Sequence, residues 1–254
     1  MLHGVGGGHL SFSPQLEAFA SAGYRAVAWD MPGYGYSAPV EPFTFMGLAK
    51  RCIELIEALQ CDDVSLLGHS MGGMVAQEVA LRRPDLVKRL VLCGTSAGFA
   101  RRSDGTVATD WAQRFVSDRT AALDAGQGMA KLAEQLVPAM VGPQAEAEGV
   151  RVAVHCLSEV PESTYRRALE CITTFDRQAA LSHLSMPVLL VGGSHDRVAP
   201  PAAMRQMAKA VPRGRYEEID GAGHLMHLET PEAFNACVLS FLREPVHGAH
   251  TGLQ

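Results

Sequence analysis

The strongest constraint on the fold is a short turn that stands between an apolar run and a helical pattern. Residues Val64 to Leu67 are typical of a buried strand, and residues Gly72 to Arg83, ended by Pro84, have the pattern of a helix. The turn reads Gly68-His69-Ser70-Met71-Gly72. This G-x-S-x-G pattern between a strand and a helix is typical of a nucleophilic serine, because small neighbours allow a strained turn that packs closely. The alternative is a glycine-rich turn in which the serine only caps the helix.

A serine hydroxyl is a weak nucleophile, so the prediction requires a base and an acid that orients the base. Asp196 follows the apolar run from Met186 to Val191, and His224 stands in a glycine-rich loop after the last apolar run. Taken singly, Asp196 is also compatible with a turn residue, and His224 with an ordinary loop histidine. The order serine, aspartate, histidine along the chain matches a known serine triad. We therefore predict Ser70 as nucleophile, His224 as general base and Asp196 as the acid.

The segment from Leu2 to Gly8 is rich in glycine. Such a loop is able to present a backbone N–H, and together with the N–H of Met71 it would form an oxyanion hole for a tetrahedral intermediate. We predict Val5 and Met71 as the two donors. A plain flexible leader is the competing interpretation. A phosphate-binding loop is disfavoured because no Lys-Ser or Lys-Thr pair ends the glycine run.

Apolar runs alternate with helical patterns along most of the chain. This alternation predicts an α/β fold with a mainly parallel central sheet, helices on both faces, and functional groups at the carboxyl ends of the strands. The other predicted strands are Tyr24 to Trp29, Leu86 to Cys93, Met186 to Val191 and Arg215 to Ile219, and the other predicted helices are Phe43 to Leu59, Ala202 to Val211 and Pro231 to Leu242.

The order breaks in the middle of the chain. Short helical patches follow one another there, at Trp111 to Val116, Met129 to Leu136 and Thr164 to Ile172. We predict a helical cap insertion at residues 96–185, between core segments at residues 1–95 and 186–254. The tail from Glu244 onward is expected to be loose.

The composition excludes several classes of protein. The chain has 254 residues, of which 47% are hydrophobic and 19% charged, and its net charge of -5 gives no general attraction to nucleic acid or anionic lipid. No signal-peptide pattern or membrane-spanning apolar run is present. The six cysteines are scattered, and neither they nor the histidines near His224 have zinc-ligand spacing. We expect a cytoplasmic protein with reduced thiols, without metal or other cofactor, and without nucleic-acid or membrane partners.

With these motifs the chain resembles the α/β-hydrolase superfamily, in particular its serine esterases, enol-lactonases and cofactor-free haloperoxidases. The similarity covers nearly the whole chain. Besides the segments above, it includes Leu2-His3-Gly4, a D-x-x-G-x-G-x-S pattern from Asp30 to Ser37, Pro84-Asp85-Leu86-Val87, and the stretch from His227 to Glu232. The resemblance implies an α/β-hydrolase fold in which the cap shapes the substrate pocket.

The resemblance also implies a sheet that lacks the usual N-terminal strands. Members of the family usually have two strands and most of a third before the His-Gly loop, whereas this chain starts almost at the loop. The absent strand would lie between the segments Tyr24 to Trp29 and Val64 to Leu67. Its absence would leave unpaired backbone groups on two central strands. A shortened fold, a different closure of the sheet and a strand from another subunit all stay open.

The nucleophile narrows the expected reaction. Dehalogenases and epoxide hydrolases of this fold carry aspartate in place of Ser70, and carbon–carbon bond hydrolases often have asparagine in place of His69. We expect a carboxylic-ester hydrolase, a carboxylesterase or lactonase, that acts on small, largely apolar substrates through an acyl-enzyme on Ser70. The stretch from Cys171 to Asp176 is similar to enol-lactonases, so a lactone substrate stays open. Carbon–carbon bond hydrolysis, perhydrolysis, and ligand binding with little turnover are the alternatives.

Three apolar residues are candidates for substrate contacts: Trp111 in the expected cap, and Val198 and Leu225 beside the predicted triad. Apolar side chains in such positions also pack simply against their neighbours. The expected partner is a small-molecule ester or lactone, and a homo-oligomer is left open.

Overall fold

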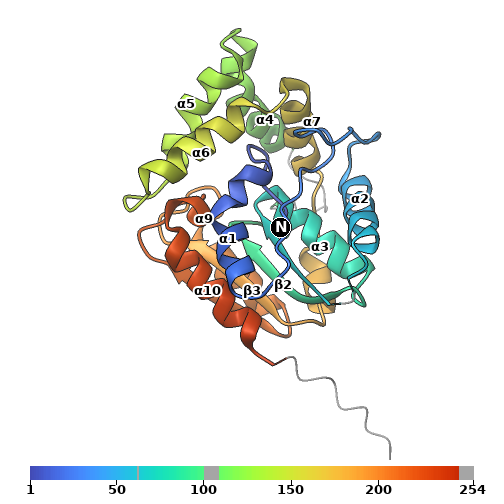
Figure 1. Cartoon of the computed structure of the whole chain (residues 1–254). Coiled ribbons are helices and arrows are strands. Elements are labelled where there is room, and N and C mark those ends of the chain that lie inside the picture. Colours follow the sequence, from blue (N-terminus) through green and yellow to red (C-terminus); the bar gives the residue numbers. More distant parts are fainter. Residues whose placement is uncertain (62, 100–108, 246–254) are drawn as a thin grey trace, which may run out of the picture.

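A parallel sheet of four strands lies at the centre of the computed structural model, which describes residues 1–61, 63–99 and 109–245 (Figure 1). The strands are β1 (Val64–His69), β2 (Val87–Cys93), β3 (Val188–Gly193) and β4 (Gly214–Ile219), and they are hydrogen-bonded in that order. All three pairings are parallel. Each strand lies within two residues of a predicted run, so the parallel sheet expected from the alternation is confirmed.

Helices cover both faces of the sheet, which explains why the central strands are largely apolar, with β3 buried throughout. On β2, Leu90 and Leu92 face one core, while Val91 and Cys93 face the other. The first core is closed by α2 (Phe45–Ala58), α3 (Met71–Arg82) and α8 (Pro201–Ala210), and the second by α1 (Ser13–Ser21) and α10 (Pro231–Arg243). The helices predicted at these places are confirmed within two residues, apart from α1, which the sequence analysis did not identify.

Four helices between β2 and β3 lie together beyond the end of the sheet (Figure 1). They are α4 (Thr109–Asp124), α5 (Gly128–Met140), α6 (Ala147–Ser158) and α7 (Glu162–Thr173). Three of them contain the predicted helical patches, whereas α6 was not predicted. The division of the chain into a core and a cap at residues 96–185 stays a prediction, and part of that segment, residues 100–108, lies outside the described residues.

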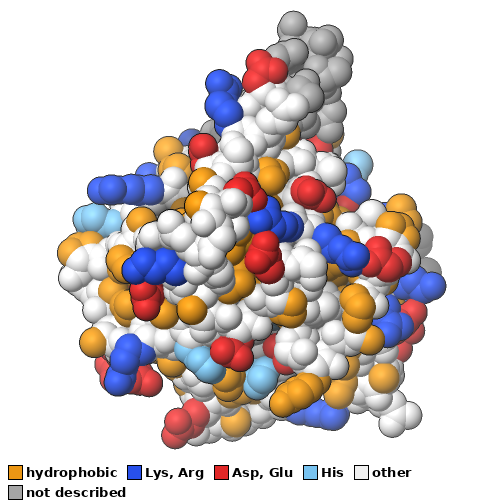
Figure 2. Space-filling view, turned by 90° about the horizontal axis from the view of Figure 1, so that it is seen from above, with side chains coloured by type: hydrophobic (Ala, Val, Ile, Leu, Met, Phe, Trp, Pro, Cys, Tyr) orange, Lys and Arg blue, Asp and Glu red, His pale blue; other side chains and the backbone are white. Residues whose placement is uncertain are grey.

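Acidic and basic side chains are intermixed on the face that Figure 2 shows. No single sign of charge dominates that face, in line with a small net charge. Within the described ranges, no helix combines the length and the apolar character needed to cross a bilayer. The predicted loose tail falls mostly in residues 246–254, outside the described part of the chain.

The prediction of a strand from Tyr24 to Trp29 is wrong. This segment is extended, but it forms only one isolated bridge, between Trp29 and Leu2. Leu2 also bridges Gly68, again in parallel, so the first two residues lie between the segment and β1. The Leu2 N–H donates to Leu67 O at 2.8 Å, and the His69 N–H donates to Leu2 O at 2.9 Å. A strand requires a hydrogen-bonded partner along its length, and the segment Tyr24 to Trp29 has only Met1 and Leu2 beside it.

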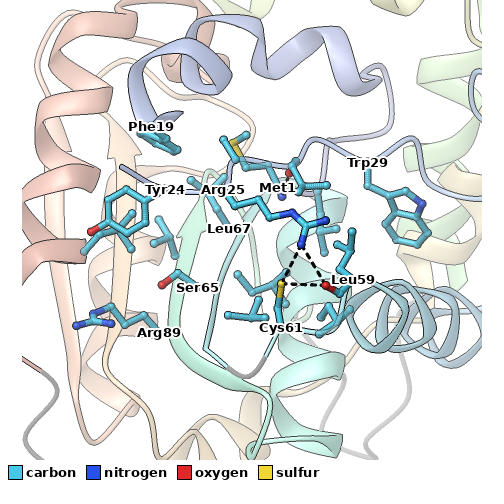
Figure 3. A pocket seen from close by; sticks show the side chains of 18 of the residues that line it. Met1, Phe19, Tyr24, Arg25, Trp29, Leu59, Cys61, Ser65, Leu67 and Arg89 are labelled. Atoms are coloured by element: carbon cyan, nitrogen blue, oxygen red, sulfur yellow. Dashed lines mark hydrogen bonds between the residues drawn. The ribbon is translucent and has the colours of Figure 1, made fainter. Parts of the chain in front are cut away.

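Beyond Met1 the space between the two segments is a groove of about 350 Å³ (Figure 3). Its walls are mostly apolar and include Phe19, Tyr24, Leu59 and Leu67. The backbone groups of residues 25–26 make no hydrogen bond to a described residue. The Met1 ammonium group donates to Val27 O at 2.7 Å, and burial lowers its pKa to about 6. The sheet is therefore continuous at its carboxyl end and open at its amino end.

Filling this groove should stabilise the protein. We expect that Thr-Val-Ile-Val placed before Met1 pairs with both walls and replaces the buried ammonium by a peptide N–H. A gain of about 2 kcal/mol would raise the Tm by roughly 4 to 8 °C. Thermal unfolding followed by circular dichroism measures the change. Pro-Gly-Pro-Gly at the same place is the control, because proline has no N–H to donate. Equal Tm values for the two extended proteins would contradict the expectation.

Candidate active site

Ser70 occupies a strained turn at the carboxyl end of β1. Its backbone has φ 52° and ψ −119°, a conformation that non-glycine residues rarely adopt, and α3 begins at the next residue. The Ser70 N–H donates to Cys93 O at 2.9 Å, and the Thr95 hydroxyl donates to Ser70 O at 2.6 Å. These bonds hold the turn in place on β2. The turn matches the geometry that the G-x-S-x-G pattern predicts.

The glycines of the turn allow three chain segments to meet. A Cβ on Gly68 would lie 2.3 Å from Gly72 O, and a Cβ on Gly72 would lie 2.2 Å from Leu2 O. Either contact would push α3 away from β1 or from the first residues of the chain. The two glycines are therefore required by close backbone approach.

Asp196 and His224 form a buried hydrogen-bonded pair. The distance between Asp196 Oδ2 and His224 Nδ1 is 2.9 Å, and the side chains are 0% and 5% exposed. The other oxygen of Asp196 accepts from the N–H groups of Val198 and Ala199 at 2.7 and 2.9 Å. An ionised carboxylate only accepts hydrogen bonds, so Nδ1 carries the proton of the neutral imidazole. Nε2 of His224 is then free to accept a proton.

The predicted oxyanion donors lie on two segments that meet at Ser70. Met71 is the first residue of α3, and Val5 lies on the loop that follows Leu2. Neither N–H donates to an acceptor among the residues that the structure describes. Val5 and Ser70 line the same cavity. Both N–H groups therefore lack a described protein acceptor, and of the two residues Val5 lines the cavity whereas Met71 is buried.

His3 fixes the loop that carries Val5. The Met31 N–H donates to Nε2 of His3 at 3.0 Å, so the proton on Nδ1 donates to Gly4 O, which lies 2.8 Å away. Burial lowers the pKa of His3 to about 4, which keeps the ring neutral. In the sequence His3 belongs to the Leu2-His3-Gly4 motif, which by itself predicts no role for the side chain.

Two cavities meet at Ser70. One, of about 360 Å³, is lined by Val5, His224 and Leu225, and the other, of about 440 Å³, is lined by Thr95 and Trp111. The two cavities share Ser70, Phe115, Asp118, Arg119, Ile172 and Val198. Each of the three predicted substrate contacts therefore lines at least one cavity that contains Ser70. Helix α4 and the loop after β3 separate the two spaces.

Glu229 ties the loop of His224 to the end of α5. This buried carboxylate accepts three backbone N–H groups: those of Gly142 at 2.6 Å, Gly223 at 2.8 Å and Leu225 at 2.7 Å. The His224 N–H also donates to Met140 O at 2.7 Å. The sequence analysis placed Glu229 in a motif without a role. Its partner Gly142 is 87 positions away, so no local pattern identifies the contact.

Three histidine rings pack beside the nucleophile. The centroid of His69 lies 4.8 Å from that of His224 and 4.4 Å from that of His227. Burial lowers the pKa of His69 well below its ordinary value, and that of His227 to about 3. His69 Nε2 lies 2.8 Å from the backbone oxygen of His224, to which a protonated Nε2 donates. His69 and His227 thus form a neutral support for the loop of His224.

The thiols and acidic side chains form no candidate metal site in the described ranges. All six cysteines are free. In the described part of the chain, no three His, Cys, Asp or Glu side chains gather in an arrangement able to hold a metal ion.

Replacing Glu229 should destabilise the loop that it holds. We expect Glu229→Gln to lower the free energy of unfolding by about 1 to 3 kcal/mol, because an amide cannot accept all three N–H groups in this geometry. Urea unfolding measures the loss, and hydrogen exchange should become faster at Gly223 and Leu225. Glu232→Gln, an exposed change nearby, is the control. Unchanged protection of both amides would contradict this assignment.

Replacing His227 should weaken the dependence of stability on pH. The unfolded chain protonates His227 near its ordinary pKa of 6.5, whereas the folded chain does so only near 3. Between these values the unfolded state binds the additional proton, so the free energy of unfolding falls as the pH falls. In His227→Phe the loss between pH 7.5 and 4.5 should be smaller by roughly 2 kcal/mol.

Urea unfolding at the two pH values measures this difference. The phenyl ring keeps the contact with Phe12, whose ring centroid lies 5.0 Å from that of His227. Replacement of the exposed His155 by Gln is the control. Equal pH dependence in the wild type and His227→Phe would refute the prediction.

Comparison with known proteins agrees with this geometry. A family model described as alpha/beta hydrolase fold matches residues 1–231. The chain is 32% identical over 248 residues to BpoC of Mycobacterium tuberculosis, provisionally named a non-heme bromoperoxidase, with 94% of this chain and 90% of that protein covered. It is 26% identical over 241 residues to 3-oxoadipate enol-lactonase 2 of Acinetobacter baylyi, with 93% and 85% covered.

A solved structure, that of a thermophilic esterase from Thermogutta terrifontis, matches with a TM-score of 0.82 at 25% identity and covers 95% of this chain and 88% of the esterase. The resemblance that the motifs carry is thus confirmed, and the chain belongs to the α/β-hydrolase fold family.

Proposed function

We propose that this protein is a serine hydrolase that cleaves carboxylic esters of small, largely apolar substrates. The observation that carries the proposal is the buried Asp196–His224 pair, whose histidine lines the same cavity as the strained Ser70. Acyl transfer requires a serine hydroxyl and a base that is held by a carboxylate, and here a half-buried Ser70 and the base line one cavity. The cavity offers an apolar wall for the body of the substrate.

The proposed reaction has two halves. His224 Nε2 takes the proton of the Ser70 hydroxyl as Oγ attacks the ester carbonyl, and the protonated histidine then gives this proton to the departing alcohol. Water repeats the sequence on the acyl-enzyme, which releases the carboxylic acid and restores the Ser70 hydroxyl. The N–H groups of Val5 and Met71 stabilise the negative oxygen in both halves. Asp196 keeps Nδ1 protonated and favours the imidazolium.

The relatives support an ester or a lactone as substrate. One relative is named an enol-lactonase and one solved structure is an esterase. A lactone is a cyclic ester, so the same groups would open it. The name of BpoC keeps perhydrolysis as a second candidate, in which hydrogen peroxide replaces water on the acyl-enzyme. Hydrolysis of a carbon–carbon bond is a further alternative without a specific observation in its favour.

Turnover of activated esters tests the roles of the three residues. We expect wild-type protein to hydrolyse a chain-length series of p-nitrophenyl esters and Ser70→Ala to lose at least about a thousandfold in kcat. His224→Ala should lose as much, and Asp196→Asn several orders of magnitude, because the histidine then adopts the wrong tautomer. Circular dichroism checks folding, and the exposed Ser182→Ala is the matched control.

Two outcomes would overturn the proposal. A folded Ser70→Ala variant that keeps most of the rate would remove the nucleophile from the mechanism. Rapid labelling of Ser70 followed by very slow release, with every ester of the series, would favour a ligand-binding protein with little turnover. Peracid formed from acetate and hydrogen peroxide at a rate above ester hydrolysis would favour the perhydrolase.

A further inference from the structure

Arg119 is a cation on the wall of both cavities that contain Ser70. It lies on α4 and is half-buried, with a pKa that burial lowers. A guanidinium remains protonated at neutral pH, so the charge persists in this partly dry place. A positive charge beside the nucleophile calls for an explanation, because burying a charge without a partner is costly.

Most of the N–H groups of Arg119 have no protein acceptor. The guanidinium carbon lies 3.9 Å from the centre of the Phe115 ring, and one nitrogen donates to Phe115 O at 3.2 Å. A guanidinium carries five N–H donors, and a ring stacked on its face leaves those in its plane free. No other hydrogen bond from this side chain to a described residue is found. The guanidinium is thus stacked on the Phe115 ring, while most of its N–H donors have no acceptor among the described residues.

In the described part of the chain Arg119 also makes no ion pair, although an arginine on the adjacent helix makes two. On the adjacent α7, Arg166 pairs with Asp124 at 2.7 Å and with Glu162 at 2.9 Å. No ion pair joins Arg119 to a carboxylate among the described residues. The adjacent Asp118 is exposed and also lines both cavities, and its charge attracts Arg119 without a direct contact. Arg119 therefore lies on the wall of both cavities without a direct ion-pair partner among the described residues.

We propose that Arg119 binds a carboxylate on the substrate, so that the preferred substrates are small esters or lactones that carry one free carboxylate besides the scissile acyl group. This inference rests on the proposed function and names the class of substrate for the same site. A planar carboxylate matches the fork of a guanidinium with two parallel hydrogen bonds. The apolar cavity walls fit the hydrocarbon between the two ends.

Attraction of a substrate carboxylate would come from Arg119 itself and not from the overall charge of the protein. The net charge is -5, and the face shown in Figure 2 mixes both signs of charge, so no general field draws anions to the protein. A phosphate carries more charge and more acceptor oxygens than one guanidinium satisfies, which favours a carboxylate.

The test compares esters that differ only in the charge at the far end. Monomethyl esters of dicarboxylic acids from succinic to suberic acid are paired with the methyl esters of the fatty acids of equal carbon number. We expect the ratio of kcat/KM, charged to neutral, to exceed about ten at the best chain length. Arg119→Gln should lower this ratio by about 10- to 100-fold, mainly through KM. For Arg119→Lys we expect a ratio between those of wild type and Arg119→Gln, because lysine keeps the positive charge but cannot make two parallel hydrogen bonds to a carboxylate.

Arg151→Gln is the matched control, because it removes the same charge from an exposed position on the cap helix α6. The ratio should be unchanged in that variant. Binding of the intact monoesters to Ser70→Ala protein, measured by calorimetry with and without Arg119→Gln, decides the inference even where turnover is low. A ratio near one in wild type, or a ratio and an affinity that Arg119→Gln leaves unchanged, would overturn it. If neutral esters still require Ser70 in that case, the proposed function stands without this refinement.

Discussion

The turn at Ser70 holds three chain segments in contact: the end of β1, the start of α3 and the residues around Leu2. Leu2 bonds to Leu67 and His69 on one side, and its carbonyl lies against Gly72 on the other. These contacts bring Val5 and Met71 to the same serine. The first two residues of the chain, which bridge to the end of β1, thus position the segment that carries Val5, one of the two proposed oxyanion donors. The groove beyond Met1 leaves this end of the sheet intact, since the bridges of Leu2 are at the carboxyl edge.

The local signals in the sequence predict the core and the order of the three candidate catalytic residues. Strands buried on both faces are unbroken apolar runs, and the glycines around Ser70 report a close backbone approach that any such turn requires. The segment Tyr24 to Trp29 shows the limit of this reasoning. Its residues favour a strand, but strand formation depends on a partner, which no local pattern reports. For the same reason the contacts of Glu229 and the cavity position of Arg119 became visible only in three dimensions.

The proposed base and the helices above it share one network of hydrogen bonds. Met140, at the end of α5, accepts the N–H of His224, and Glu229 joins Gly142 to Gly223 and Leu225. A displacement of α5 would therefore move the loop of His224 as well. The same helix lines the cavity at Ser70 through Leu136, Val137 and Met140. A change in the position of α5 would consequently alter both the shape of the cavity and the orientation of His224.

The charges around Ser70 follow from burial. His3, His69 and His227 are buried, which keeps their pKa values low and their rings neutral. This neutrality suits the proposed mechanism, because a second imidazolium 4.8 Å from His224 would oppose the positive charge that His224 gains in the reaction. Arg119, by contrast, keeps its charge and lines both cavities that contain Ser70. Burial therefore keeps the histidines beside the proposed base neutral, whereas the group proposed to recognise the substrate is a guanidinium, which stays protonated at neutral pH.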